Sequence, residues 1–230
     1  MRDNMAANAG FLREREDYQR LILEHLRDDN GYRIRGASSY NAGLAMDAEM
    51  LFSFLQNTQG ADLEKLEKIY KDKTQETVAQ LINSEINRRG LLDALKTGVD
   101  FGNGVKLDLM YRKPAASFNA KLNELYRQNI FSVMEEVYHK ENERLDMLIF
   151  LNGFAIFAFE LKSNVSGQSV EDAIRQYKNE RDYKTRTFIF KSGVLVSFAM
   201  DLKEVYMCTR LEGRSSFFLP FTDPAILHSI

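Results

Sequence analysis

The 230-residue chain has little cysteine and little histidine. A single thiol, Cys208, excludes an internal disulfide framework and a cysteine-based zinc site. The three histidines, His25, His139 and His228, are scattered along the chain and have no spacing that suits a metal ion. One unpaired thiol is typical of a reducing compartment, so we expect a cytoplasmic protein.

Long apolar runs and a surplus of charge of either sign are also missing. No apolar run approaches the roughly 18 residues of a membrane-spanning helix, and the N-terminus, MRDNMAANAG, lacks the pattern of a signal peptide. With 31 Lys and Arg against 33 Asp and Glu, the formal charge of −2 argues against general polyanion binding but allows a local basic face. Hydrophobic residues, at 44%, suffice for a sizeable core. The sequence predicts a soluble globular protein with no membrane partner.

Helical patterns dominate the first hundred residues. Apolar residues recur at helical spacing after residue 13, and the pair at 30–31, Asn-Gly, is a helix stop. A short strand is expected over residues 32–40. Helices are predicted over residues 13–29, 47–55, 62–70, 74–88 and 91–96.

From residue 105 the pattern changes to strands. Strands are predicted over residues 105–111, 129–138, 145–152, 154–162, 185–198 and 202–208. One helix interrupts them over residues 169–183, where Ser169 to Asp172 form a capping pattern. This order predicts an α/β or α+β fold in which helices flank a sheet. Because no repeat or low-complexity linker divides the chain, we expect one domain over residues 1–230, helical over about 1–100, with a sheet core over about 101–210.

The segment RLDMLIFLNGFAIFAFELKSN is the most informative part of the chain. Its Asn-Gly pair at 152–153 predicts a hairpin with Asp146 on the first strand and Glu160 and Lys162 on the second. With a two-residue loop and a regular register, Asp146 would point away from the other two, because neighbouring strand residues alternate faces. A three-residue loop, or a β-bulge, would put all three side chains on one face.

Two carboxylates and an ammonium on one face suit the hydrolysis of a phosphodiester. Mg²⁺, or Mn²⁺, binds hard carboxylate oxygens and keeps positions for water and phosphate. Asp146 and Glu160 would be ligands together with the backbone carbonyl of Leu161, and Lys162 would orient or deprotonate the attacking water and stabilise charge on the phosphate. In the structural alternative, Glu160 and Lys162 form an ordinary ion pair at a sheet edge.

These residues, in this order, resemble the PD-(D/E)xK nuclease superfamily, and more narrowly the N-terminal region of the restriction (R) subunit of type I restriction-modification enzymes. Leu145 stands where that family has proline, and Glu180 stands where its Gln-x-x-x-Tyr element has tyrosine. Tyr177 and Tyr183 are candidate replacements. The resemblance covers most of the chain and rests on Arg144-Leu145-Asp146, Asn152-Gly153, Glu160-Leu161-Lys162 and Gln176.

The resemblance implies a restriction-endonuclease-like mixed sheet flanked by helices and Mg²⁺-dependent cleavage of double-stranded DNA. It implies catalytic roles for Asp146, Glu160, Lys162 and Gln176, and it implies modification and specificity subunits as partners. ATP would serve a motor part, and the chain contains no G-x-x-x-x-G-K-[ST] phosphate loop. We therefore expect it to be the nuclease portion of a longer polypeptide.

A basic stretch follows the motif. We interpret Arg175, Lys178, Arg181 and Lys184 as contacts to DNA phosphates, although a solvated helix face explains them equally well. In the superfamily an acid from the first helix often completes the metal site, and the candidates are Glu14, Glu16 and Glu24. Two rival functions are a standalone repair or recombination nuclease with the same site and a non-catalytic DNA-binding or scaffolding module.

Overall fold

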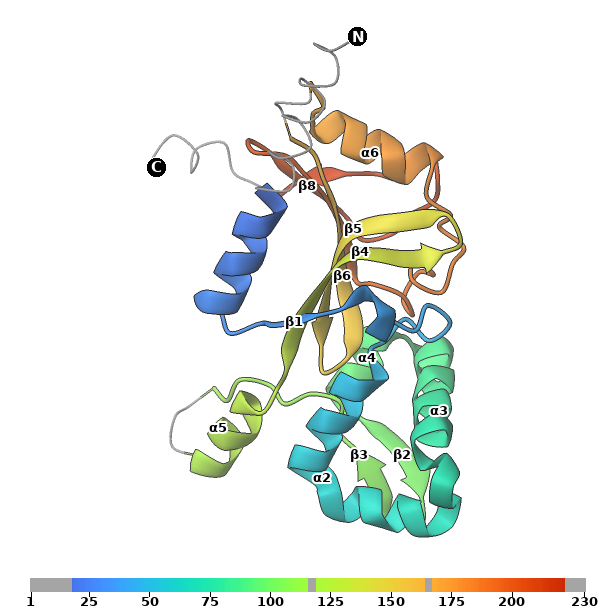
Figure 1. The fold of residues 1–230 in the computed structure, drawn as a ribbon. Coiled ribbons are helices and arrows are strands. Elements are labelled where there is room, and N and C mark those ends of the chain that lie inside the picture. Colours follow the sequence, from blue (N-terminus) through green and yellow to red (C-terminus); the bar gives the residue numbers. More distant parts are fainter. Residues whose placement is uncertain (1–17, 116–118, 164–166, 222–230) are drawn as a thin grey trace.

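The computed structural model describes residues 18–115, 119–163 and 167–221. At its centre is a seven-stranded mixed sheet in the order β1-β4-β5-β6-β7-β8-β9 (Figure 1). The antiparallel run β4-β5-β6 is extended by β7, parallel to β6, and by β1, parallel to β4. The strands are β1 Arg33–Arg35, β4 Phe131–Lys140, β5 Glu143–Leu151, β6 Phe154–Leu161, β7 Val196–Met200, β8 Val205–Cys208 and β9 Leu219–Pro220.

Helices flank this sheet, so the predicted α+β fold is confirmed. In Figure 1, α6 lies against the sheet, while α2, α3 and α4 gather near the other end with the small hairpin of β2 and β3. Residues 18–28 are also helical, and the expected start of this helix at residue 13 lies outside the described residues. The bounds are α2 Ala48–Tyr70, α3 Thr74–Arg89, α4 Leu91–Thr97, β2 Val99–Gly102, β3 Val105–Leu107, α5 Ala120–Arg127 and α6 Val170–Asn179. No helix of the described residues is long and apolar enough to cross a membrane.

The two helices predicted over 47–55 and 62–70 correspond to the two arms of α2, which meet at a kink at Gln59, so the expected break between them is confirmed. The start is as predicted, because Asp47 caps the helix and accepts the N–H of Met50 at 3.2 Å. At Gln59 the backbone leaves helical geometry, with φ −145° and ψ 34°. Its side-chain amide pairs in both directions with the backbone of Asp108, at 2.7 and 2.8 Å. A distant segment therefore stabilises a kink where local sequence suggests a loop.

The strand predicted over 185–198 is also wrong for most of its length. Only β7, from Val196, is extended, and the preceding residues form turns. The N–H of Val194 donates to the carbonyl of Thr187 at 2.8 Å, and a Cβ on Gly193 would lie 2.2 Å from that same oxygen. Glycine at 193 thus allows a close backbone approach that turns the chain.

Other differences from the prediction are smaller. Helix α6 ends at Asn179, four residues earlier than expected. Three short elements, α5, β2 and β9, had no clear signal in the sequence.

Both faces of the central strands are covered, which explains their continuous apolar composition. On one face Leu148, Phe150 and Ala158 pack with α6. On the other face Met147 and Ile149 pack with residues of α2, α3 and the helix at 18–28. The alternation along β5 and β6 therefore decides which side chains lie beneath α6.

Candidate active site

The hairpin turn between β5 and β6 has a two-residue loop. Leu151 pairs with Phe154, and the two loop residues both have left-handed backbone, with φ 50° at Asn152 and 84° at Gly153. This is the geometry for which Asn-Gly is favoured. The Asn152 side chain is buried and accepts the N–H of Ile130 at 2.6 Å.

A β-bulge follows the turn and changes the register. Phe150 pairs with Ala155. The next pair is Ile149 with Phe157, which leaves Ile156 as an extra residue on β6. Of the alternatives considered from sequence, the three-residue loop is wrong and the bulge is confirmed.

The shifted register makes Asp146 and Glu160 cross-strand neighbours. The ladder between β5 and β6 ends at the pair Met147 and Phe159, and the next residue on each strand is one of these acids. Both acids follow the alternation to the face that α6 covers. The Asp146 carboxylate accepts the backbone N–H of Leu161 at 2.7 Å, so it reaches across to the end of β6.

The second half of the motif is joined to α6. Lys162 follows β6, and its ammonium donates to the side-chain oxygen of Gln176 at 2.5 Å. The start of α6 is fixed by Ser169, the N-cap of a capping box with Asp172. The structure thus brings Asp146, Glu160, Lys162 and Gln176 together from β5, β6 and α6.

Burial makes the two carboxylates unusual. The side chain of Glu160 is fully buried, while Asp146 is 4% and Lys162 is 7% exposed. Burial, followed by the nearby charge of Asp146, raises the pKa of Glu160 to about 8, although Arg181 acts in the opposite direction. Arg181 donates from Nε to Oε1 of Glu160 at 2.7 Å, whereas Oε2 has no hydrogen-bond partner among the described residues.

A divalent cation fits these donors. The unsatisfied buried oxygen of Glu160 beside the Asp146 carboxylate offers the hard ligands that Mg²⁺ prefers. The N–H and C=O of a strand residue point to the same side, so the Leu161 carbonyl lies on the side from which its N–H reaches Asp146. Within the described ranges no cluster of three or more His, Cys, Asp or Glu residues could hold a metal. Backbone, water and phosphate oxygens would have to complete the coordination.

A polar pocket of about 460 Å³ opens onto the site. Its wall contains Asp146, Lys162, Gln176 and Arg181, but Glu160 lies behind it. A substrate in this pocket would reach the carboxylate, the ammonium and the guanidinium. Sequence reasoning missed two further lining residues, which carried no motif, namely Tyr138 in β4 and Asn142 in the β4–β5 turn.

Two tyrosines, Tyr177 and Tyr183, were candidates for the tyrosine of the Gln-x-x-x-Tyr element. Tyr177 is fully buried under α6, and burial, with Glu160 and Asp146 nearby, raises its pKa well above the usual value. Tyr183 is exposed and lies beside Gly213. Neither lines the pocket.

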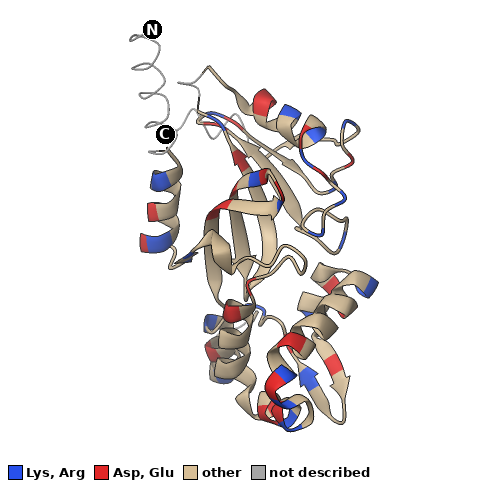
Figure 2. Cartoon of the chain, turned by 45° about the vertical axis from the view of Figure 1, so that its right-hand side comes forward, with Lys and Arg blue, Asp and Glu red and all other residues tan. Residues whose placement is uncertain are grey.

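The basic residues after the motif differ in their surroundings. Arg175 is exposed and pairs with Asp172 at 2.7 Å, and Lys184 is exposed beside Tyr183. Lys178 is half-buried, and the side chain of Arg181 points inward to Glu160. Figure 2 shows acidic and basic residues interspersed over the helices.

The structure does not identify an acid of the first helix that would complete the metal site. The side chain of Glu24 is 46% exposed and approaches Arg20 to 3.8 Å. Glu14 and Glu16 lie outside the described residues. The same helix does approach the site through Gln19, which is buried and donates to the backbone carbonyl of Asp146 at 3.2 Å.

Comparisons with known proteins identify the family. Residues 11–216 match the family model described as type I restriction enzyme R protein N terminus. A curated relative from Methanocaldococcus jannaschii, named as a type I restriction enzyme endonuclease subunit, is 29% identical over 143 residues. The aligned part is 59% of this chain and 13% of that relative, so the chain spans only a small part of the relative's length. The chain belongs to the family formed by the N-terminal region of type I restriction enzyme R proteins.

Proposed function

We propose that this chain is the DNA-cleaving domain of a type I restriction enzyme R subunit and that it hydrolyses phosphodiesters with Mg²⁺. One observation carries the proposal. The bulge at Ile156 brings Asp146 opposite Glu160, beside Lys162, at a pocket that is open to a substrate. In an ordinary hairpin register these side chains would lie on opposite faces.

Asp146, Glu160 and the carbonyl of Leu161 would hold the metal ion. When bound, Mg²⁺ acts as a Lewis acid toward a phosphate oxygen and lowers the pKa of a coordinated water. Glu160 is suited to this role because its side chain is already buried in the folded protein. Binding of the metal ion therefore requires no further desolvation of this group.

Lys162 would act on the attacking water and on the phosphate. Its ammonium lies on the pocket wall and is held by the Gln176 oxygen, which limits its rotamers. A positioned ammonium orients a water and stabilises the negative charge that develops on phosphate oxygens. Gln176 is therefore assigned the role of positioning Lys162.

Membership of the family supports a proposal for the substrate and the partners. We propose double-stranded DNA as the substrate, with Arg175, Lys178 and Lys184 near the backbone phosphates. Modification and specificity subunits would complete the restriction complex in the cytoplasm, and ATP would be used by a motor part outside this chain.

The test is cleavage by the complete restriction complex with supercoiled DNA, ATP and Mg²⁺. Asp146→Ala and Lys162→Ala should each lower the rate of DNA nicking by about 100-fold or more, while ATP hydrolysis continues. Asp62→Ala is a matched control, because Asp62 lies on α2 and pairs with Lys65 at 2.6 Å, away from the pocket. Unchanged nicking by the Asp146 variant would exclude this site as the nuclease centre.

The scaffolding alternative has one observation in its favour, the ion pair that covers Glu160. A scaffold that keeps the fold would bind no divalent ion at this position. Isothermal titration of the chain with Mn²⁺ separates the two functions, because the nuclease requires binding that Asp146→Asn abolishes. The reading frame beyond Ile230 distinguishes a standalone nuclease from a restriction subunit. A phosphate-loop motif in that reading frame would indicate the restriction subunit.

A further inference from the structure

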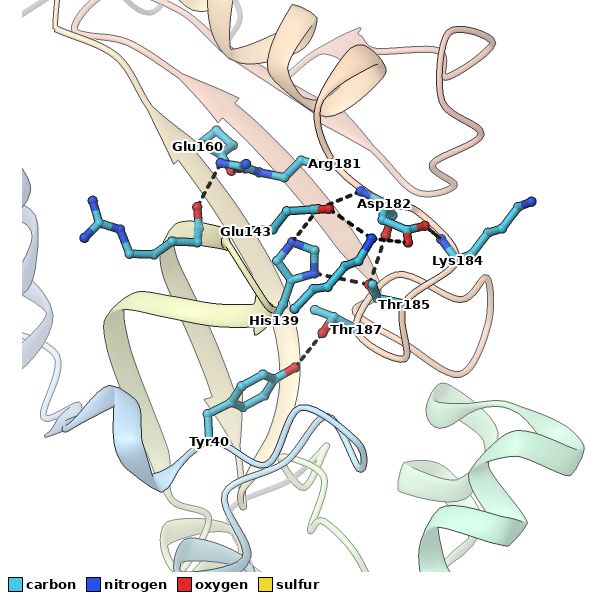
Figure 3. Close-up of polar contacts among 11 residues, drawn as sticks. Tyr40, His139, Glu143, Glu160, Arg181, Asp182, Lys184, Thr185 and Thr187 are labelled. Atoms are coloured by element: carbon cyan, nitrogen blue, oxygen red, sulfur yellow. Dashed lines mark hydrogen bonds and ion pairs between the residues drawn. The ribbon is translucent and has the colours of Figure 1, made fainter.

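Arg181 lies between the pocket and Glu160. The guanidinium lines the pocket, whereas the carboxylate to which it donates is fully buried behind it. Figure 3 shows the two side chains directed toward one another, Glu160 from β6 and Arg181 from the segment after α6. An ion that enters from the pocket therefore meets the guanidinium before it meets Glu160.

The position of Arg181 is built into the fold. Its backbone N–H donates to the carbonyl of Gln176 at 3.1 Å, and its Nη2 donates to the carbonyl of Arg144 at 2.8 Å. The carboxylate of the next residue, Asp182, accepts a hydrogen bond from the Lys140 ammonium at 2.8 Å. The backbone N–H of Asp182 donates to the Glu143 carboxylate, also at 2.8 Å. These contacts tie the segment after α6 to the β4–β5 turn (Figure 3).

The charges explain why the guanidinium lies there. A buried carboxylate is costly unless a cation pairs with it. The Lys162 ammonium is directed to the neutral oxygen of Gln176, and Arg181 supplies the charge at Oε1 of Glu160. A divalent ion on Glu160 would stand a few ångströms from this guanidinium, where like charges in a buried site repel strongly.

We propose that Arg181 is the resident counter-ion of Glu160 and that it leaves the carboxylate when a divalent ion binds. Metal binding and the Arg181–Glu160 ion pair are then mutually exclusive. The inference rests on the proposed metal site at Asp146 and Glu160. The unpaired Oε2 of Glu160 is the atom at which an incoming ion would begin the exchange.

The direct test is the NMR signal of the Arg181 side-chain Nε–H in the whole chain, assigned by its loss in Arg181→Lys. Without metal, the signal should show a hydrogen-bonded, slowly exchanging proton. At Mg²⁺ saturation, measured by calorimetry, it should shift to the position of a solvent-exposed guanidinium. An unchanged signal at saturation would overturn the inference and leave the metal site standing. Absence of any Mg²⁺ binding that depends on Asp146 would overturn both.

Mn²⁺ affinity gives a second readout. With pH and ionic strength held equal, Arg181→Met should bind Mn²⁺ about tenfold more tightly or better, because the competing charge is gone. Arg175→Met is the control for net charge, since Arg175 is exposed on α6 and pairs with Asp172. Equal or weaker binding by Arg181→Met than by wild type would contradict displacement.

Should Arg181→Met be folded but too unstable for direct titration, the rise in its melting temperature with Mn²⁺ replaces that measurement. The rise should exceed that of wild type at the same Mn²⁺ concentration, and a smaller rise would contradict the proposal. Glu160→Gln removes the carboxylate in either background and should abolish the metal-dependent rise.

Discussion

Two single residues, Gly153 in the β5–β6 turn and His139 in β4, are expected to affect the stability of the whole protein. At Gly153 the turn meets the start of α2. Its carbonyl accepts the N–H of Asp47 at 2.7 Å, and an added Cβ would lie 2.3 Å from the carbonyl oxygen of Asp47. The turn that precedes the bulge is therefore held by the helical part of the molecule.

Gly153→Ala should destabilise the protein by roughly 3 kcal/mol or more, because left-handed strain and a backbone overlap act together. Gly102→Ala is the matched control. It has a similar φ of 75°, but nothing lies within 4 Å of the added carbon, so a cost of about 1 kcal/mol is expected. Urea denaturation measures both, and equal losses would show that the contact with Asp47 is unimportant.

His139 should make stability depend on pH. Its side chain is fully buried between Thr185 and Glu143, and burial lowers its pKa to about 4, although the charges of Glu143 and Asp182 act in the opposite direction. Below pH 6.5 the unfolded chain takes up a proton that the folded chain resists, so stability falls as pH falls. The loss between pH 7 and pH 5 should be about 2 kcal/mol from this group.

Urea denaturation at the two pH values measures this effect. Acidification from pH 7 to pH 5 should lower the unfolding free energy of His139→Gln by about 2 kcal/mol less than that of wild type, because the contribution of the buried imidazole is gone while the other groups are the same in both proteins. His25→Gln is the control for replacing a histidine at an exposed position. An undiminished decrease in His139→Gln would assign the pH dependence to other groups.

At the scale of elements, the structure depends on how β5, β6 and α6 meet. The Asn-Gly turn and the capping pattern at Ser169 were predictable because each depends on residues next to one another. The bulge at Ile156 was open from sequence, because an apolar strand has no local signal for an extra residue. The inward direction of Arg181 was not predictable either, since it depends on Glu160, 21 residues away.

Helix α6 carries Gln176 and leads to Arg181, so its start should influence the site. Ser169→Ala should lower the free energy of unfolding by about 1 kcal/mol, because the capping box is lost. It should also raise the rate of amide hydrogen exchange in the first turn of α6, as measured by mass spectrometry. Unchanged stability and exchange would show that packing of Tyr177 and Ala173 alone fixes the helix.

At the scale of the whole molecule, the helices before the sheet share a core with one of its faces. A continuous apolar cluster runs from Leu55 and Ile82 in the helices to Ile149 and Phe154 in the sheet. The guanidinium of Arg186 adds a polar link, with two donations to Asn83 of α3 at 2.8 and 2.9 Å. We propose that the chain is one domain, as its lack of an internal linker predicts.

A single domain of this kind should unfold in one cooperative transition. Far-UV circular dichroism reports the helices, and near-UV dichroism reports the aromatic packing of the sheet. The two melting curves should coincide. Two separate transitions would show that the helical part and the sheet fold independently.

The central claim is that Asp146 and Glu160 share one divalent ion. Crystals of the chain soaked with Mn²⁺ test it by anomalous diffraction. We predict one strong peak within about 2.0–2.4 Å of a carboxylate oxygen of each acid, with the Arg181 guanidinium withdrawn from Glu160. A fully soaked crystal with no peak at this position, and with the Arg181–Glu160 pair intact, would contradict the account.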